Sequence, residues 1–91
     1  MTRTVTRQPP QGQVSFTGRL VRAGRALENA TAYRLESPRA GVWMPLTYVV
    51  AGPGVNLEGH VGSVVELWGT GHYRGDLRGN LLQAMTVIPQ P

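Results

Sequence analysis

The stretch NLEGHVGSVVELWG, residues 56–69, determines the fold that the sequence predicts. Its first half has the features of one short helical turn. Asn56 is a favourable N-cap, Leu57 and Val61 lie four residues apart on one face, and Gly62 suits the left-handed position that ends a helix. A helix this short is not stable alone, so we expect it to pack over one end of a barrel.

Alternation of apolar and polar residues predicts strands on both sides of this turn. The predicted strands are 14–22, 31–36, 42–50, 63–69 and a last strand interrupted between 71–73 and 81–88. The connections are expected to be a polar loop at 23–29, where one helical turn at 25–28 is the alternative, and turns at 37–41 and 74–80. Gly18 predicts a sharp bend or bulge in the first strand. Because Pro45 cannot donate a ladder hydrogen bond, the third strand should lie at an edge or be bulged there.

Three strands, a short helix and two further strands are the element order of an OB-type barrel. We therefore predict an all-β fold, a small five-stranded antiparallel OB-type barrel with one short helix between strands three and four. An SH3-like barrel is the alternative, since it also has five short strands and a single helical turn. The predicted core consists of Val14, Phe16, Leu20, Tyr33, Leu35, Leu46, Tyr48, Val50, Val65, Leu67, Leu82 and Val87.

Three segments of this region also resemble a known pattern. Tyr48-Val49-Val50, Asn56–Gly62 and Val64–Gly69 are similar to small bacterial OB-fold-like domains, in which a strand is followed by a "dLe-x-x-vG" helical turn and a "V-x-V-x-G" strand. The resemblance is close over residues 48–69 and loose over 14–88. It implies the fold and says little about activity, because most such domains have no established function.

The length of 91 residues suits one domain, which we place at 14–91 behind a polar leader at 1–13. The leader has almost no apolar side chains, so it should contribute nothing to stability. It also lacks the apolar region of a signal peptide, and no stretch approaches the ~20 apolar residues of a membrane helix. The sequence therefore predicts a cytoplasmic protein without a membrane span. The absence of cysteine leaves the redox compartment open.

All of the positive charge comes from arginine. The chain has nine arginines and no lysine against five acidic residues, which gives a net charge of +4. A codon bias would explain the missing lysine but not the net charge. The charge favours a polyanionic partner such as nucleic acid.

Catalytic and metal-binding patterns are absent from the sequence. The five carboxylates lie in separate predicted elements, and no serine stands in a G-x-S-x-G elbow. His60 and His72 do not have the spacing of metal ligands. We therefore predict a non-catalytic binding module with no cofactor and no metal.

The candidate binding residues follow from the way OB barrels bind ligands. A ligand crosses strands two and three and is bounded by the loop after strand one and the loop between strands four and five. Arginines in those loops can meet phosphates, and outward aromatic rings can stack on bases. The candidate ligand-binding residues are Arg22, Arg25, Arg34, Trp43, Trp68, Tyr73, Arg74 and Arg78.

Two functions remain open at this point. One is a protein-interaction or assembly domain, which would bind a protein partner or a second copy through the Pro45 edge strand and the outward tryptophans Trp43 and Trp68. The other is a single-stranded nucleic-acid-binding domain that uses the arginine-rich loops and exposed aromatic residues.

Overall fold

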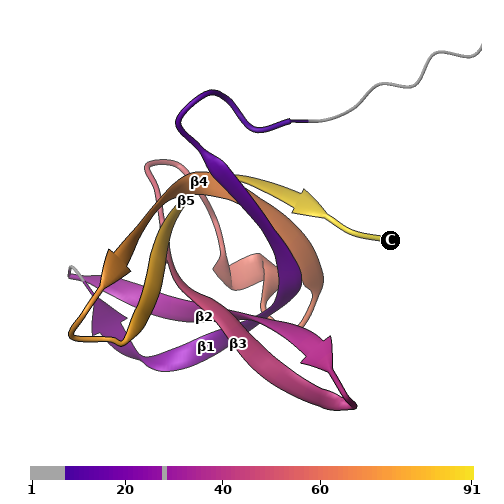
Figure 1. Ribbon diagram of the computed structural model, residues 1–91. Coiled ribbons are helices and arrows are strands. Elements are labelled where there is room, and N and C mark those ends of the chain that lie inside the picture. Colours follow the sequence, from indigo (N-terminus) through magenta and orange to yellow (C-terminus); the bar gives the residue numbers. More distant parts are fainter. Residues whose placement is uncertain (1–7, 28) are drawn as a thin grey trace, which may run out of the picture.

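Five strands close into one β-barrel, with a single turn of 3₁₀ helix between the third and fourth strands (Figure 1). The computed structural model describes residues 8–27 and 29–91. Residues 1–7 of the predicted leader lie outside the described residues. The elements are β1 (Val14–Leu27), β2 (Ala30–Arg39), β3 (Val42–Ala51), η1 (Glu58–His60), β4 (Val64–Arg74) and β5 (Gly79–Pro89).

The strands follow the order β1-β2-β3-β5-β4 around the ring, and β4 closes it by pairing with β1. Every neighbouring pair is antiparallel except β3 and β5, which are parallel. The predicted closed β-barrel is confirmed, but the prediction of a wholly antiparallel sheet is wrong. Directions cannot alternate completely around a closed ring with an odd number of strands, so a closed five-stranded barrel needs at least one parallel pair.

β1 is longer than predicted and takes part in two ladders. Its first half pairs with β4 and its second half with β2, and Arg19 pairs with both neighbours. The change of partner occurs beside Gly18, where a Cβ atom would lie 2.3 Å from the main-chain oxygen of Glu36. The bend predicted at this glycine therefore has a steric basis. The predicted loop at 23–29 is wrong, because β1 continues to Leu27 and pairs with Ala30 after a register shift.

In β3, the residues that point into the barrel differ from those predicted. In the β2–β3 ladder Leu35 pairs with Thr47 and Glu36 with Pro45, so Leu46 is an extra residue in a bulge. The bulge reverses the alternation: the Leu46 residue is 37% exposed whereas Thr47 is only 4% exposed. Leu46 is therefore exposed, although it was predicted in the core. Among the other predicted core residues, Val14 is exposed, and Phe16, Tyr48 and Val87 are half-buried.

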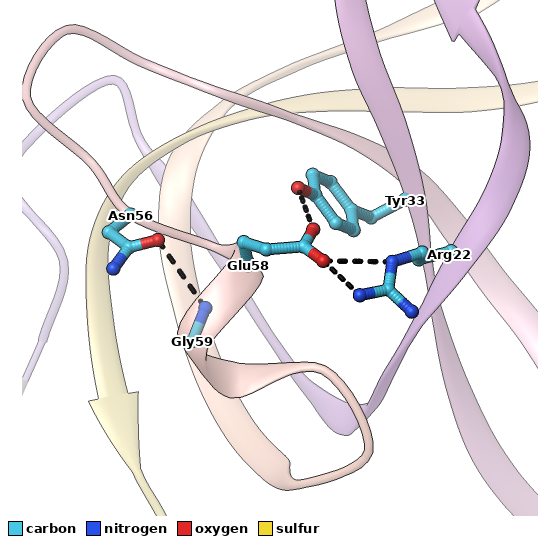
Figure 2. Close-up of polar contacts among 5 residues, drawn as sticks. All are labelled: Arg22, Tyr33, Asn56, Glu58 and Gly59. Carbon is cyan, nitrogen blue, oxygen red and sulfur yellow. Dashed lines mark hydrogen bonds and ion pairs between the residues drawn. The ribbon is translucent and has the colours of Figure 1, made fainter.

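η1 is shorter than the predicted helical turn, but its flanking residues pack as expected. Leu57 is buried and Val61 packs against the core cluster of the barrel. Asn56 lies one residue before the N-cap, and its Oδ1 accepts a hydrogen bond from the N–H of Gly59 at 3.4 Å (Figure 2). Gly62 has a φ of +90°, the left-handed conformation predicted from its position after the turn.

A second apolar cluster lies on the other side of β2 and β3 from the barrel interior. Ala32 and Val50 pack there against Leu27 and Leu81, which come from the ends of β1 and β5, and Leu77 of the β4–β5 turn adds to them. This cluster holds the end of β1 and the β4–β5 turn against the outer face of β2 and β3. The packing thereby positions the groove described below.

Candidate nucleic-acid interface

A groove of about 290 Å³ lies on the outer face of the barrel, between the bulged part of β3 and the β4–β5 turn. The ladder between β3 and β5 begins only at the pair Tyr48–Leu81. Before that pair the two strands separate, and the groove opens between them. Leu46 and Leu77 are among the residues on its apolar walls.

The charged side chains that line this groove are both arginines, Arg34 from β2 and Arg78 from the β4–β5 turn. Arg34 Nη2 lies 3.5 Å from Glu36 Oε2, while its buried Nε has no hydrogen-bond partner among the described residues. Arg78 sits in a tight turn with φ of +52°, and its N–H donates to the oxygen of Gly75. Tyr48 and Asn80 add an aromatic ring and an amide. The groove therefore offers hydrogen-bond donors and positive charge to an anionic ligand.

Arg19, Glu36 and Trp43 continue the same outer face beyond the groove. Glu36 is only 8% exposed, and its Oε1 lies 3.2 Å from Arg19 Nη2. The guanidinium of Arg19 in turn covers the ring of Trp43. Sequence reasoning selected Arg34 and Trp43 and missed Arg19 and Glu36. Their alternation with the inward residues Leu20 and Leu35 is the signal that could have identified them.

Two more candidate residues, Tyr73 and Arg74, lie at the end of β4, next to the β4–β5 turn. Arg74 donates two hydrogen bonds to Asp76, at 2.9 and 2.8 Å. These bonds hold the pKa of Asp76 below its ordinary value, and the charge of Arg25 lowers it further. The end of β1 therefore lies near the β4–β5 turn. Tyr73 is largely exposed beside them.

Arg22, in contrast, does not join this face. Arg22 pairs across the ladder with Tyr33, and its side chain lies on the opposite side of β1 from that of Val21. Its Nε and Nη2 both donate hydrogen bonds to Glu58 Oε1 (Figure 2). The hydroxyl of Tyr33 donates to Glu58 Oε2 at 2.7 Å. The hydrogen bonds from Arg22 and then Tyr33 lower the pKa of Glu58, and the bond to Glu58 raises the pKa of Tyr33. This cluster attaches η1 to β1 and β2. The sequence analysis did not identify Glu58 as the partner of Arg22, since the two residues are far apart in the chain.

Trp68 also lies away from the groove. It pairs with Ser15 of β1 and Thr86 of β5, and its Nε1 donates to Glu66 Oε2 at 2.7 Å. β4, which carries Trp68, is not a neighbour of β3, which carries Trp43. The two tryptophans therefore belong to different parts of the barrel surface.

The β2–β3 hairpin presents a run of exposed apolar residues. All five residues of Val42–Leu46 are exposed, including Val42 at 58% and Met44 at 46%. This part of β3 pairs with β2 but lies before the β3–β5 ladder, so its other edge is free of a strand among the described residues. Exposed apolar groups in such a row are a feature of protein-interaction surfaces.

Residues 8–27 and 29–91 contain no cluster of three side chains suited to hold a metal ion. The same part of the chain has no helix with the length and apolar character that crossing a membrane requires. No protein-family model and no curated protein sequence matches this chain.

Proposed function

We propose that this domain is an OB-type barrel that binds single-stranded nucleic acid across the outer face of β2 and β3. The observation that carries the proposal is the groove in which Arg34 and Arg78 face an opening bounded by Tyr48, with no carboxylate on its walls. Phosphates would meet the two guanidinium groups, and bases would stack on the exposed aromatic rings.

The arrangement of the strands supports an OB-type barrel. η1 lies between β3 and β4, as the short helix does in that fold, and the residues of the resemblance, 48–69, span this region. OB barrels bind oligonucleotides on the face of their second and third strands, next to the loops between strands one and two and strands four and five. The groove adjoins that face and the second of these loops, and Arg25 near the end of β1 adds charge beside that loop.

The carboxylates support a binding role rather than a catalytic one. The four carboxylates in the described residues have no partner in common. Glu36 contacts Arg19 and Arg34, and Glu58 contacts Arg22 and Tyr33. Glu66 accepts a hydrogen bond from Trp68, and Asp76 accepts one from Arg74. General acid–base chemistry with two carboxylates needs them to converge on one substrate position. These four lie in different elements.

The test is the binding of a fluorescein-labelled twelve-nucleotide oligothymidylate, measured by anisotropy at several salt concentrations. We expect binding that weakens steeply as salt rises, because each neutralised phosphate releases counterions. Arg78→Ala should weaken binding and lower the salt slope by somewhat less than about one unit. Arg22→Ala is the matched control, since it removes the same charge outside the proposed interface. The proposal fails if the oligonucleotide does not bind at low salt.

A protein-interaction or assembly domain is the second candidate, and the exposed Val42–Leu46 run favours it. An apolar interface gives a weak dependence on salt, in contrast to phosphate binding. Sedimentation velocity at increasing protein concentration tests self-association, which Met44→Glu should abolish. A monomer at all concentrations would exclude a second copy as the partner.

A further inference from the structure

A second cavity, of about 190 Å³, lies at the end of the barrel away from η1. η1 adjoins the middle of β1, where Arg22 Nε donates a hydrogen bond to Glu58 Oε1 of η1. Val14 and Gly71, which line the second cavity, lie toward the other end of the β1–β4 pair. We refer to this cavity as the barrel-mouth pocket.

The barrel-mouth pocket adjoins the groove. Both cavities are lined by Thr47 and Asn80, and the Thr47 hydroxyl lies 3.1 Å from the main-chain oxygen of Asn80. They therefore meet where β3 and β5 separate. A chain that lies in the groove with its phosphates on the arginines can place one group in the pocket.

The pocket combines apolar walls with a few polar groups. Phe16 and Val14 supply an aromatic ring and a methyl surface, while Asn80 supplies an amide. His72 also borders the pocket, but it pairs with Leu81 of the outer apolar cluster, so its imidazole lies on the other side of β4 from Gly71. Gly71 keeps the space open, because a Cβ atom there would lie 3.3 Å from Val14 Cγ2. An aromatic wall beside an exposed amide is suited to an unstacked nucleobase.

We propose that the barrel-mouth pocket receives one base of the bound strand and prefers adenine. This inference rests on the proposed function. Asn80 favours adenine when the base presents its N6 and N7 edge to the carboxamide, because these two atoms form a bidentate pair of hydrogen bonds with it. The groove then supplies affinity through phosphates, and the pocket supplies base preference.

The experiment uses labelled pentanucleotides of thymidylate in which the central base is T, A, G or C. The adenine-containing strand should bind at least about fivefold more tightly than the others, as one bidentate base contact allows. Asn80→Leu should remove this preference. Gly71→Val should remove it too while leaving the salt dependence unchanged, because its side chain would fill the pocket without touching the groove arginines. Gln83→Leu is the matched control, an amide-to-aliphatic change on β5 outside both cavities, and should keep the preference. Circular dichroism checks that each variant is folded.

The outcomes separate the two proposals. If no pentanucleotide or longer strand binds at low salt, the proposed function itself is refuted and the pocket proposal with it. If the four strands bind equally, or another base is preferred, the pocket proposal alone is refuted. An adenine preference that survives Gly71→Val also overturns it, because the base would then lie elsewhere.

Discussion

The guanidinium carbon of Arg19 lies 4.2 Å from the centroid of the Trp43 ring. This distance is typical of a cation–π contact. Arg19 is held in place from its other side by Glu36, so one face of Trp43 is covered in the free protein. A base that stacks on Trp43 would use the uncovered surface of the ring or displace the guanidinium.

Trp43→Ala should weaken binding of the twelve-nucleotide strand by about 1–3 kcal/mol, the usual contribution of one stacked base. The side chain is exposed, so its removal should change the melting temperature little. Fluorescence anisotropy measures the affinity. Trp68→Ala is the control, because Trp68 lies on β4 away from the groove. Equal losses in the two variants would contradict a stacking role for Trp43.

Glu36→Gln should strengthen binding at low salt and steepen the salt dependence. The change removes the negative charge between Arg19 and Arg34, so both guanidinium groups can interact with phosphate. It should also lower thermal stability, because two arginines lose a buried partner. Glu66→Gln removes a carboxylate from β4 and should leave the affinity unchanged. Unaltered binding by Glu36→Gln would show that phosphate does not reach these arginines.

The contribution of Glu58 to stability should depend on pH. Its pKa in the folded protein lies below the ordinary value of 4.5, owing to the hydrogen bonds from Arg22 and Tyr33. A carboxyl group with a lowered pKa stabilises the fold above about pH 4.5 and loses that effect as the pH falls through the lowered value. Thermal unfolding should therefore show wild type more stable than Glu58→Gln at pH 6–7, with a difference that shrinks toward pH 3. A constant difference over this range would contradict the ion pair.

Gly69→Ala should destabilise the barrel by about 1–3 kcal/mol or more, as overpacking does. A Cβ atom at Gly69 would lie 1.9 Å from the main-chain oxygen of Gln83, at the register shift between β4 and β5. Gly79→Ala is the matched control on β5, where the nearest atom is 3.9 Å away. Urea unfolding measures both, and equal stability of the two variants would contradict the close approach of β4 and β5.

The sequence was informative where local chemistry decides the structure. Gly62 follows the helical turn in a left-handed conformation, and Leu57 is buried, as their positions in the sequence predicted. The turn between β4 and β5 also lies within the predicted segment 74–80. Each of these features depends on a few consecutive residues.

Features that depend on pairing between distant segments could not be predicted in this way. The side chain of Thr47 is inward and that of Leu46 is exposed because a bulge forms against β2, and hydropathy alone favours the reverse. The extension of β1 to Leu27 depends on Ala30 as its ladder partner and on the apolar cluster with Leu81. For the candidate site, the arginines were identified by residue type. Which of them shares a face with Trp43 depends on strand phase and pairing: Arg22 lies on the same side of β1 as Leu20 and reaches Glu58, whereas Arg19 lies on the opposite side.

The parallel contact between β3 and β5 consists of four residue pairs, Tyr48–Leu81 to Ala51–Ala84. The partners in this seam are 33 residues apart in the chain, so closing it costs more loop entropy than closing a hairpin. The β1–β4 ladder joins residues still farther apart, but it has six pairs to offset that cost, whereas the seam has four. We therefore expect the ring to close late in folding and to open there first in the native state. Backbone amides of the seam should exchange with deuterium faster than those of the β1–β2 ladder. A strand bound in the adjoining groove would hold the seam closed and slow that exchange.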